Sequence, residues 1–335
     1  MAEPVFLGLD VGSVSTNLAV RAADGRVLLT DYRYTVGDPI HVTRAMLLDA
    51  LDGGGLDVRG VGVTGSGRNL IGSVVGADVK RTEIIAHFRG ALGVRPRCRT
   101  IIEIGGQDSK IVCVQDGAIA DFNMNSICAA GTGAFLDSQA RRLGIDVKDV
   151  GDLALAAKRV APISGRCTVF AETDMIHRQQ QGFAKAEILA GLCRSLVKNY
   201  LNNCAKGKPI REEVLFQGGV SNNKGIVRAF EEELGVRVIV PEHNDVMGAV
   251  GMAIFASEIA GPTAFKGIDA IAGATYETAS FGCERCESRC DVVEVKEDGR
   301  TIAYWGGACE RWTRQLEEGG AQADAPDRSD RSDAG

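Results

Sequence analysis

The chain lacks long apolar runs, a surplus of basic residues and a large aromatic content. Aromatic residues make up only 5% of its 335 residues, so a core must be mostly aliphatic. No run approaches the ~20 apolar residues that a membrane helix needs, and the N-terminus has no signal-peptide pattern. The formal net charge of −6 argues against a general nucleic-acid binder. We therefore expect a soluble, cytoplasmic protein without nucleic-acid or membrane partners.

Glycine and cysteine, in contrast, are plentiful. The 42 glycines fall in short motifs rather than in repeats, which excludes collagen-like and low-complexity chains. Ten cysteines are many for a protein of a reducing compartment. There they are expected to be metal ligands, catalytic thiols or small core residues rather than disulfides.

One order of elements occurs twice along the chain. Three strands with short turns, then helices and further strands, are predicted from about 5 to 64 and again from about 100 to 240. The pattern indicates an α/β fold with two similar lobes. The predicted units are residues 1–95 with the helix 244–260 as first lobe, 96–243 as second lobe, a cysteine-rich metal-binding segment at 273–316 and a disordered tail at 317–335.

Three predicted strands end in loops that combine glycine with Asp, Ser, Gln or Asn. They span residues 10–16, 105–110 and 218–222. Glycine-rich turns direct backbone N–H groups at phosphates, and strand-end carboxylates hold Mg²⁺ through water. Each turn alone is as easily an ordinary hairpin turn; the three in order are more specific. The candidate nucleotide-binding residues are Gly12, Ser13, Ser15, Thr16, Gly105, Gly106, Lys110, Gly218, Gly219 and Asn222.

These loops resemble those of the actin, hexokinase and sugar-kinase superfamily. Residues 9–13 and 104–110 are similar to its two phosphate loops, and 216–220 to its adenosine loop. The resemblance implies two actin-like, ribonuclease H-like lobes that close over ATP or ADP with Mg²⁺. Asp10 and Asp108 are then the expected organisers of Mg²⁺ and the attacking water, with Gln107 as the residue that positions this water. The absence of a Walker A lysine pattern excludes a P-loop ATPase.

Cys128 and Cys167 each stand directly before a predicted helix. A helix N-terminus carries partial positive charge and free N–H groups, which favours an anionic centre. An Fe₄S₄ cluster needs four cysteines, and an isologous dimer would present two cysteines twice. The alternative is that both are small buried residues.

The motifs around these two cysteines decide between the alternatives. Residues 128–136 and 164–172 resemble the activators of 2-hydroxyacyl-CoA dehydratases and the ATPase subunits of benzoyl-CoA reductases, and the resemblance covers about 6–257. It implies a homodimer with one bridging [4Fe-4S] cluster, reduced by ferredoxin or flavodoxin. It also implies ATP-driven transfer of one electron to an iron–sulfur dehydratase or reductase of CoA thioesters. Glu103 departs from the Asp expected there, which leaves the partner class open.

The other cysteines form two groups. Cys283, Cys286, Cys290 and Cys309 have metal-ligand spacing, and a second iron–sulfur cluster is favoured over structural zinc, with unmetallated thiols as the third alternative. Cys98, Cys113, Cys193 and Cys204 are expected to be core or partly exposed thiols. No catalytic role is predicted for the histidines at 41, 87, 177 and 243.

Two other functions compete with an electron-transferring ATPase. One is a small-molecule kinase of the same superfamily, such as an amino sugar kinase, against which the cysteine motifs argue. The other is a nucleotide-gated redox or metal sensor that reports through its C-terminal cysteines.

Overall fold

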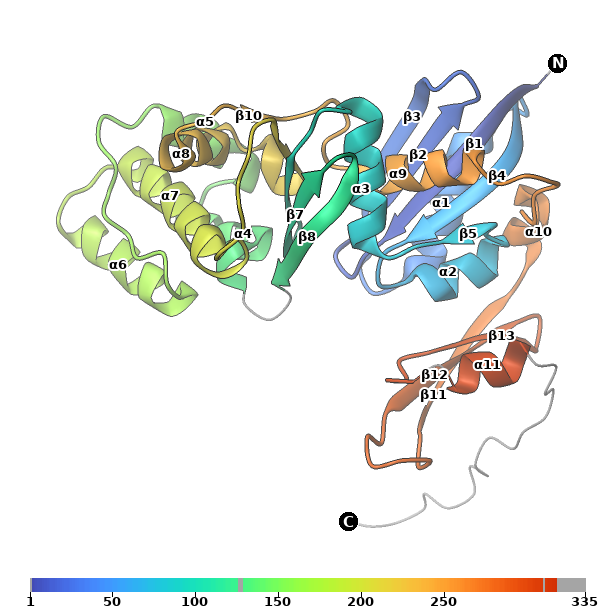
Figure 1. The fold of residues 1–335 in the computed structure, drawn as a ribbon. Coiled ribbons are helices and arrows are strands. Elements are labelled where there is room, and N and C mark those ends of the chain that lie inside the picture. Colours follow the sequence, from blue (N-terminus) through green and yellow to red (C-terminus); the bar gives the residue numbers. More distant parts are fainter. Residues whose placement is uncertain (1, 126–128, 310, 318–335) are drawn as a thin grey trace, which may run out of the picture.

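The computed structural model describes residues 2–125, 129–309 and 311–317. Two α/β lobes lie side by side, and a smaller C-terminal module hangs from the first lobe (Figure 1). Within the described residues, no helix has the length and apolar character that crossing a membrane requires. The predicted α/β fold with two similar lobes is confirmed. The tail predicted at 317–335 lies, except for its first residue, outside the described residues.

The first lobe is built on a five-stranded sheet of order β3-β2-β1-β4-β5, in which β1 is antiparallel to β2 and parallel to β4. Successive residues of β1 point to opposite faces of the sheet, as the two-residue period of a strand requires. Leu7 and Leu9 pack against the side of α1 and α2, whereas Phe6 packs on the side of α9. The elements of this lobe are β1 (Glu3–Val11), β2 (Ser15–Ala22), β3 (Val27–Tyr34), α1 (Pro39–Leu51), β4 (Leu56–Thr64), α2 (Arg68–Val75), β5 (Val79–Lys80), α3 (Glu83–Val94) and α9 (Met247–Ser257).

The second lobe repeats this topology in the order β10-β9-β6-β7-β8. β6 takes the place of β1, antiparallel to β7 and parallel to β9. The long helix α7 buries one apolar stripe, including Leu192, Leu196 and Tyr200, against this sheet. The elements are β6 (Thr100–Ile104), β7 (Ser109–Gln115), β8 (Ala118–Asn125), η1 (Ala129–Gly131), α4 (Gly133–Arg142), η2 (Val147–Asp149), α5 (Val150–Leu155), α6 (Thr168–Gln180), α7 (Lys185–Asn203), β9 (Val214–Gln217), η3 (Gly219–Asn222), α8 (Lys224–Leu234) and β10 (Val238–Ile239).

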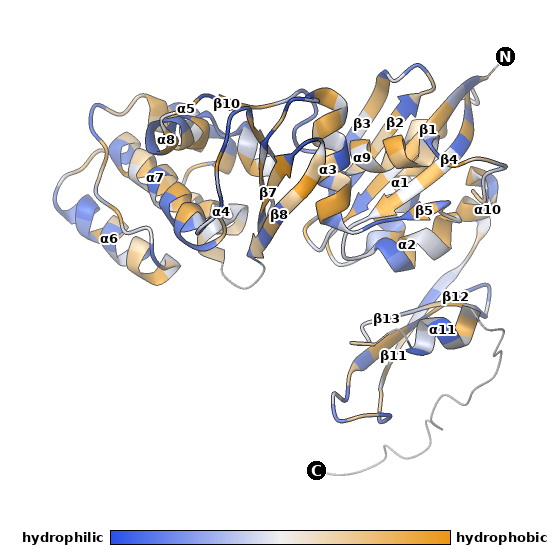
Figure 2. Cartoon of the chain, in the orientation of Figure 1, coloured by the Kyte–Doolittle hydropathy of each residue, from blue (hydrophilic) through white to orange (hydrophobic). Residues whose placement is uncertain are grey.

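Helix α9 comes late in the sequence but lies directly on the first sheet. It is buried along most of its length and is apolar on nearly all sides (Figure 2). A Cβ atom added at Gly8 would clash with the carbonyl oxygen of Ala249, and one at Gly62 with that of Met252. Glycine at these two strand positions therefore lets the helix backbone approach the sheet.

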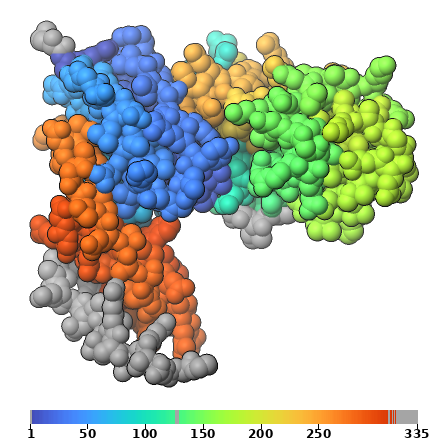
Figure 3. Space-filling model, turned by 180° about the vertical axis from the view of Figure 1, so that it is seen from behind, coloured from blue at the N-terminus to red at the C-terminus, as the bar shows by residue number. Residues whose placement is uncertain are grey.

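The C-terminal segment, predicted only as cysteine-rich, forms a three-stranded antiparallel sheet of order β11-β12-β13. Val295 and Ala303 of this sheet are buried in the same apolar cluster as residues of α1 and α2. The space-filling view shows the rest of the module standing away from the first lobe (Figure 3). Its elements are β11 (Tyr276–Gly282), β12 (Asp291–Glu297), β13 (Arg300–Trp305) and α11 (Arg311–Glu317), preceded by α10 (Ile268–Gly273).

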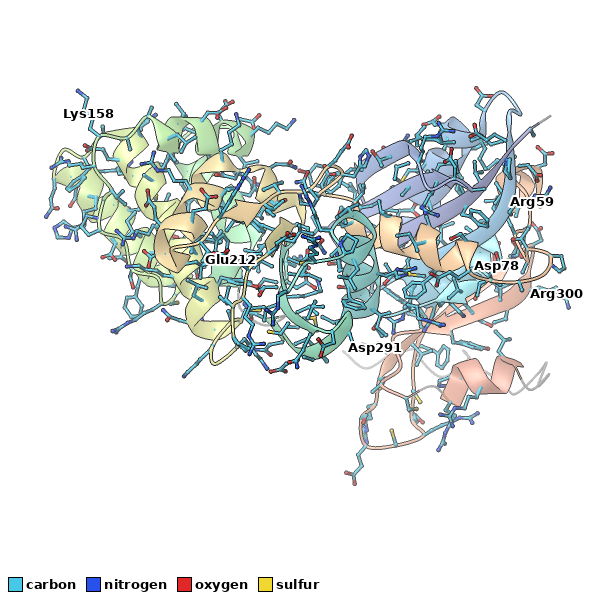
Figure 4. The ribbon with its side chains drawn as sticks, turned by 45° about the horizontal axis from the view of Figure 1, so that its top comes forward. Arg59, Asp78, Lys158, Glu212, Asp291 and Arg300 are labelled. Carbon is cyan, nitrogen blue, oxygen red and sulfur yellow. The ribbon has the colours of Figure 1, made fainter. Side chains whose placement is uncertain are left out.

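Asp78, labelled in Figure 4, fixes the segment that leads to this module. Its carboxylate accepts hydrogen bonds from the backbone N–H of Val61, at 2.7 Å, and of Ala264, at 2.6 Å. The hydroxyl of Thr263 donates to the same carboxylate at 2.7 Å. One side chain thus ties the linker after α9 to strand β4.

We expect Gly8→Ala to lower the free energy of unfolding by at least about 2 kcal/mol, because an added methyl group would separate α9 from β1. Chemical denaturation monitored by circular dichroism measures this change. Gly55→Ala is the matched control, since nothing lies within 4 Å of a Cβ atom at Gly55. Equal stability of the two variants would contradict the close approach.

Candidate active site

A cavity of about 240 Å³ opens where the two phosphate loops face each other. Its walls come from the β1–β2 turn, the β6–β7 turn, the start of α3 and the turn after β9. Eleven of the residues predicted as nucleotide-binding or catalytic line it: Asp10, Gly12, Ser13, Ser15, Gly105, Gly106, Gln107, Asp108, Lys110, Gly218 and Gly219.

The two phosphate loops touch each other across the cavity. The hydroxyl of Ser13 donates to Oε1 of Gln107 at 2.9 Å. A Cβ atom at Gly106 would lie 2.9 Å from the side chain of Val14, so the loops also meet in van der Waals contact. Gly218 has a φ of +88°, and a Cβ atom there would clash with the carbonyl oxygen of Ile104. The turn after β9 therefore requires glycine where it closes the cavity.

Two predicted nucleotide-binding residues take other positions. Among the residues described, Thr16 and Asn222 are not part of the cavity wall. The hydroxyl of Thr16 is buried 3.1 Å from that of Thr35, which in turn donates to the carbonyl of Gly12. Asn222 accepts a hydrogen bond from the amide of Asn244 at 2.9 Å. Both side chains support the loops from behind.

Lys110 is the centre of an acidic cluster at the bottom of the cavity. Its ammonium lies 2.9 Å from a carboxylate oxygen of each of Glu83, Glu103 and Asp108. The residue is 2% exposed, and its three N–H donors face these three acceptors. Lys110 was predicted to contact phosphate; here it neutralises carboxylates, and a phosphate contact would require one of them to be displaced.

The cluster holds more negative charge than Lys110 balances. Burial and the neighbouring Glu83 raise the pKa of Asp10 to about 8. Burial raises the pKa of Glu103 to about 7, although Lys110 acts in the opposite direction. For Lys110, burial disfavours the ammonium, but attraction to Glu103 and Glu83 outweighs it and raises the pKa well above its usual value.

His87 and Glu83 belong to this site, although no role was predicted for them. Both come from α3, a helix that the sequence analysis did not identify. Nε2 of His87 lies 3.7 Å from Oδ2 of Asp10, and its Nδ1 lies 3.0 Å from the amide nitrogen of Gln217. Burial lowers the pKa of His87 to about 3, so the ring is neutral. It packs between Asp10 and Gln217 without adding positive charge.

The oxygen ligands at this site suit Mg²⁺. Buried carboxylates with raised pKa values are groups that a divalent cation would stabilise in their charged form. In the described parts of the chain, no three His, Cys, Asp or Glu side chains converge on one ion position. Mg²⁺ needs only one or two protein carboxylates, because waters and nucleotide phosphates supply its other ligands.

Helix α7 holds the loop of residues 164–167, which ends at Cys167. Cys167 is the N-cap residue of α6, as predicted, and is half-buried. The amide of Asn199 donates to the backbone carbonyl of Arg166 at 2.8 Å. The hydroxyl of Ser195 donates to the backbone carbonyl of Ser164 at 2.5 Å. Cys128 lies outside the described residues. The four cysteines predicted to be core or partly exposed thiols, at 98, 113, 193 and 204, are all buried.

The four C-terminal cysteines lie at one end of the module. Cys283 is buried, Cys290 is half-buried, and Cys286 and Cys309 are exposed. The indole N–H of Trp312 and the backbone N–H of Arg285 lower the pKa of the Cys283 thiol. These four residues are far from the interlobe cavity in sequence, and none of them lines it among the residues described.

The raised pKa of Asp10 gives a pH-dependent prediction. Asp10 has a pKa of about 8 in the folded protein and about 4 when unfolded. Between pH 4 and 8 the unfolded chain therefore releases a proton that the folded protein keeps, so the free energy of unfolding falls as the pH rises. An asparagine in its place carries no charge, so Asp10→Asn should gain on the order of 1–3 kcal/mol at pH 8 and almost nothing at pH 4.5. Thermal melts without Mg²⁺ and nucleotide measure this gain. A pH-independent difference, or the same result with the exposed control Asp52→Asn, would disprove the assignment.

Comparison with known proteins agrees with this geometry. The family model described as "BadF/BadG/BcrA/BcrD ATPase family" matches residues 7–256. A similar relative is the (R)-2-hydroxyglutaryl-CoA dehydratase activating ATPase of Acidaminococcus fermentans, 36% identical over 254 residues that cover 75% of this chain and 96% of the relative.

Two solved structures of such proteins are similar throughout both lobes. Component A of the Acidaminococcus fermentans (R)-2-hydroxyglutaryl-CoA dehydratase has a TM-score of 0.70 and 32% identity, covering 76% of this chain and 98% of the other. The activator of the 2-hydroxyisocaproyl-CoA dehydratase from Clostridium difficile with bound ADPNP has a TM-score of 0.69 and 31% identity, covering 76% and 94%. The interlobe cavity, its phosphate loops and these comparisons together show that the chain is an ATPase of the BadF/BadG/BcrA/BcrD family.

Proposed function

We propose that this ATPase transfers single electrons from a reduced ferredoxin or flavodoxin to an iron–sulfur dehydratase or reductase of CoA thioesters. The similar proteins are named as activators or components of CoA-thioester dehydratases. The observation that carries the proposal is a set of hydrogen bonds that join the second phosphate loop and its strand to α4 and, through α7, to the loop before Cys167.

The nucleotide occupies the interlobe cavity in this proposal. The backbone N–H groups around Gly12 and Gly105–Gly106, with the hydroxyl of Ser13, bind the phosphates, while Gly218–Gly219 face the adenosine. Asp10 and Asp108 would hold Mg²⁺ through water, and the ion would supply positive charge that neutralises the phosphates. Gln107, held by Ser13, orients the attacking water. Lys110 keeps Glu83, Glu103 and Asp108 together.

The second phosphate loop is bonded directly to α4. The backbone N–H groups of Gly133 and Ala134 donate to the carbonyls of Gly105 and Gly106 at 2.9 and 2.8 Å. Any movement of this loop when nucleotide binds or is hydrolysed therefore moves the first turn of α4, directly after the segment that contains Cys128.

Helix α7 provides the second connection. The hydroxyl of Tyr200 donates to the carbonyl of Lys110 at 2.8 Å, so α7 is bonded to the strand that bears the acidic cluster. On the same helix, Asn199, one residue before Tyr200, and Ser195, five residues before it, hold the loop that precedes Cys167. Helix α4 and the loop before Cys167 are thus both linked to the second phosphate loop and its strand by short, specific bonds.

Cys128 and Cys167 would supply two thiolates to a [4Fe-4S] cluster, and a second copy of the chain would supply the other two. Such a cluster accepts and donates one electron at low potential. The N-cap position of Cys167 suits an anionic centre, since the first N–H groups of α6 are free to donate. Val169 and Phe170, in the first turn of α6, are 66% and 62% exposed. This apolar surface suits burial against a second copy of the chain.

Removing Cys167 tests the cluster without touching the cavity. We expect Cys167→Ser, purified without oxygen, to lose the bridging cluster and ATP-dependent electron transfer to a low-potential acceptor. Nucleotide affinity should remain within about threefold of the wild type, because Cys167 lies outside the cavity. Iron and sulfide analysis, EPR and calorimetric titration with ADP measure these quantities. A Cys167→Ser protein that keeps the wild-type EPR signal would refute the ligand assignment.

The coupling through α7 is tested by Asn199→Ala. Loss of its bond to the carbonyl of Arg166 should lower the number of electrons transferred per ATP hydrolysed severalfold, at a cost of about 1 kcal/mol in stability. Asn203→Ala is the matched control one turn along α7, where the amide bonds only to the carbonyl of Asn199. Stopped-flow reduction of an acceptor dye together with phosphate release gives the ratio. Equal ratios for the two variants would speak against this connection.

A further inference from the structure

The C-terminal module lies outside the residues that the family model matches, 7–256. It nevertheless places four cysteines at one end of its sheet. Cys283, Cys286 and Cys290 lie in the loop that joins β11 to β12, whose first residue, Asp291, is labelled in Figure 4. Cys309 lies in the connection between β13 and α11.

Hydrogen bonds hold these two loops against each other. The backbone N–H of Cys283 donates to the carbonyl of Cys290 at 2.7 Å, which closes the first loop. The backbone N–H of Ala308 donates to Sγ of Cys290 at 3.3 Å, which brings the residue before Cys309 beside it. The indole N–H of Trp312 donates to Sγ of Cys283 at 3.5 Å. Two of the four sulfurs therefore accept N–H bonds, as the sulfurs of metal-bound thiolates do.

An aromatic wall closes one side of this arrangement. The rings of Phe281 and Trp312 lie 5.0 Å apart, and those of Tyr304 and Trp312 lie 5.4 Å apart. Cys283 is buried in the same apolar cluster. The guanidinium of Arg285 lies 4.4 Å above the Trp312 ring, which brings positive charge to the thiols. Such a wall limits water access to a thiolate centre, and the charge offsets that of its ligands.

A zinc ion and an iron–sulfur cluster make different demands on the spacing of four sulfurs. A tetrahedral zinc ion, with Zn–S bonds of about 2.3 Å, needs its four sulfurs within about 4 Å of one another. A four-iron cluster is larger and takes each cysteine at a separate corner, so its ligands stand farther apart.

We propose that Cys283, Cys286, Cys290 and Cys309 of a single chain ligate a second [4Fe-4S] cluster in the C-terminal module. This site is independent of the dimer, because one chain supplies all four thiolates. It is also attached to the first lobe through Val295 and Ala303, whereas Cys167 belongs to the second lobe. The two centres are therefore separate.

Iron content separates the two centres when the full chain is reconstituted with iron and sulfide without oxygen. A cluster held by one chain adds about four iron atoms per chain, and half of a shared cluster adds about two. The wild type should thus hold about six, and Cys286→Ala with Cys309→Ala about two. Both substituted residues are exposed, so the module should still fold. Cys113→Ser, outside both ligand sets, is the matched control and should keep the wild-type content.

Cys167→Ser distinguishes failure of this proposal from failure of the bridging cluster. If only the bridging cluster is wrong, the wild type and Cys167→Ser hold the same iron, about four atoms per chain, and the double variant holds none. The proposal for the module is overturned if the double variant keeps the wild-type iron content. It is equally overturned if the wild type binds about one zinc per chain that only the double variant loses. ADP binding checks that each variant is folded.

Discussion

The buried ammonium of Lys110 holds together the acidic residues of the candidate active site. Lys110 comes from β7, whereas its three carboxylate partners come from α3, β6 and the turn between β6 and β7. Removing the ammonium would leave the buried Glu103 close to the partly exposed Glu83 and Asp108 without a counter-charge, which would destabilise the site. The bond from Glu83 to Lys110 also joins the helix between the lobes to the second sheet. The same interaction therefore gathers three carboxylates from different elements at the bottom of the cavity.

The same strand and its adjoining turn are bonded to α7 and α4. The carbonyl of Lys110 accepts from Tyr200 of α7, and the carbonyls of the adjoining turn accept from the first residues of α4. Hydrogen bonds of this length tolerate little independent movement of their partners. A change in the phosphate loop is thus expected at Cys167 without any long-range rearrangement. These bonds are the mechanical connection on which the proposed electron transfer depends.

Much of this organisation could be predicted from local sequence. Glycine-rich turns after apolar strands identified the phosphate loops, and the repeated order of elements identified the two lobes, because both signals are local. The partners of Asp10 could not be predicted in this way. Glu83 and His87 lie on a helix without a strong pattern, and only the tertiary fold brings them to the strand ends. The carboxylate partners of Lys110 could not be predicted for the same reason, since Glu83 is distant from it in sequence. The phosphate contact of Lys110 stays a prediction.

The most direct test combines nucleotide and cluster in one measurement. EPR spectra of the dithionite-reduced Cys286→Ala, Cys309→Ala protein, prepared without oxygen, would be recorded with and without MgATP. The coupling described here predicts an iron–sulfur signal whose shape or midpoint potential changes when MgATP binds, and a smaller change in Asn199→Ala. A signal that is the same with and without MgATP, or the lack of any iron–sulfur signal, would contradict it.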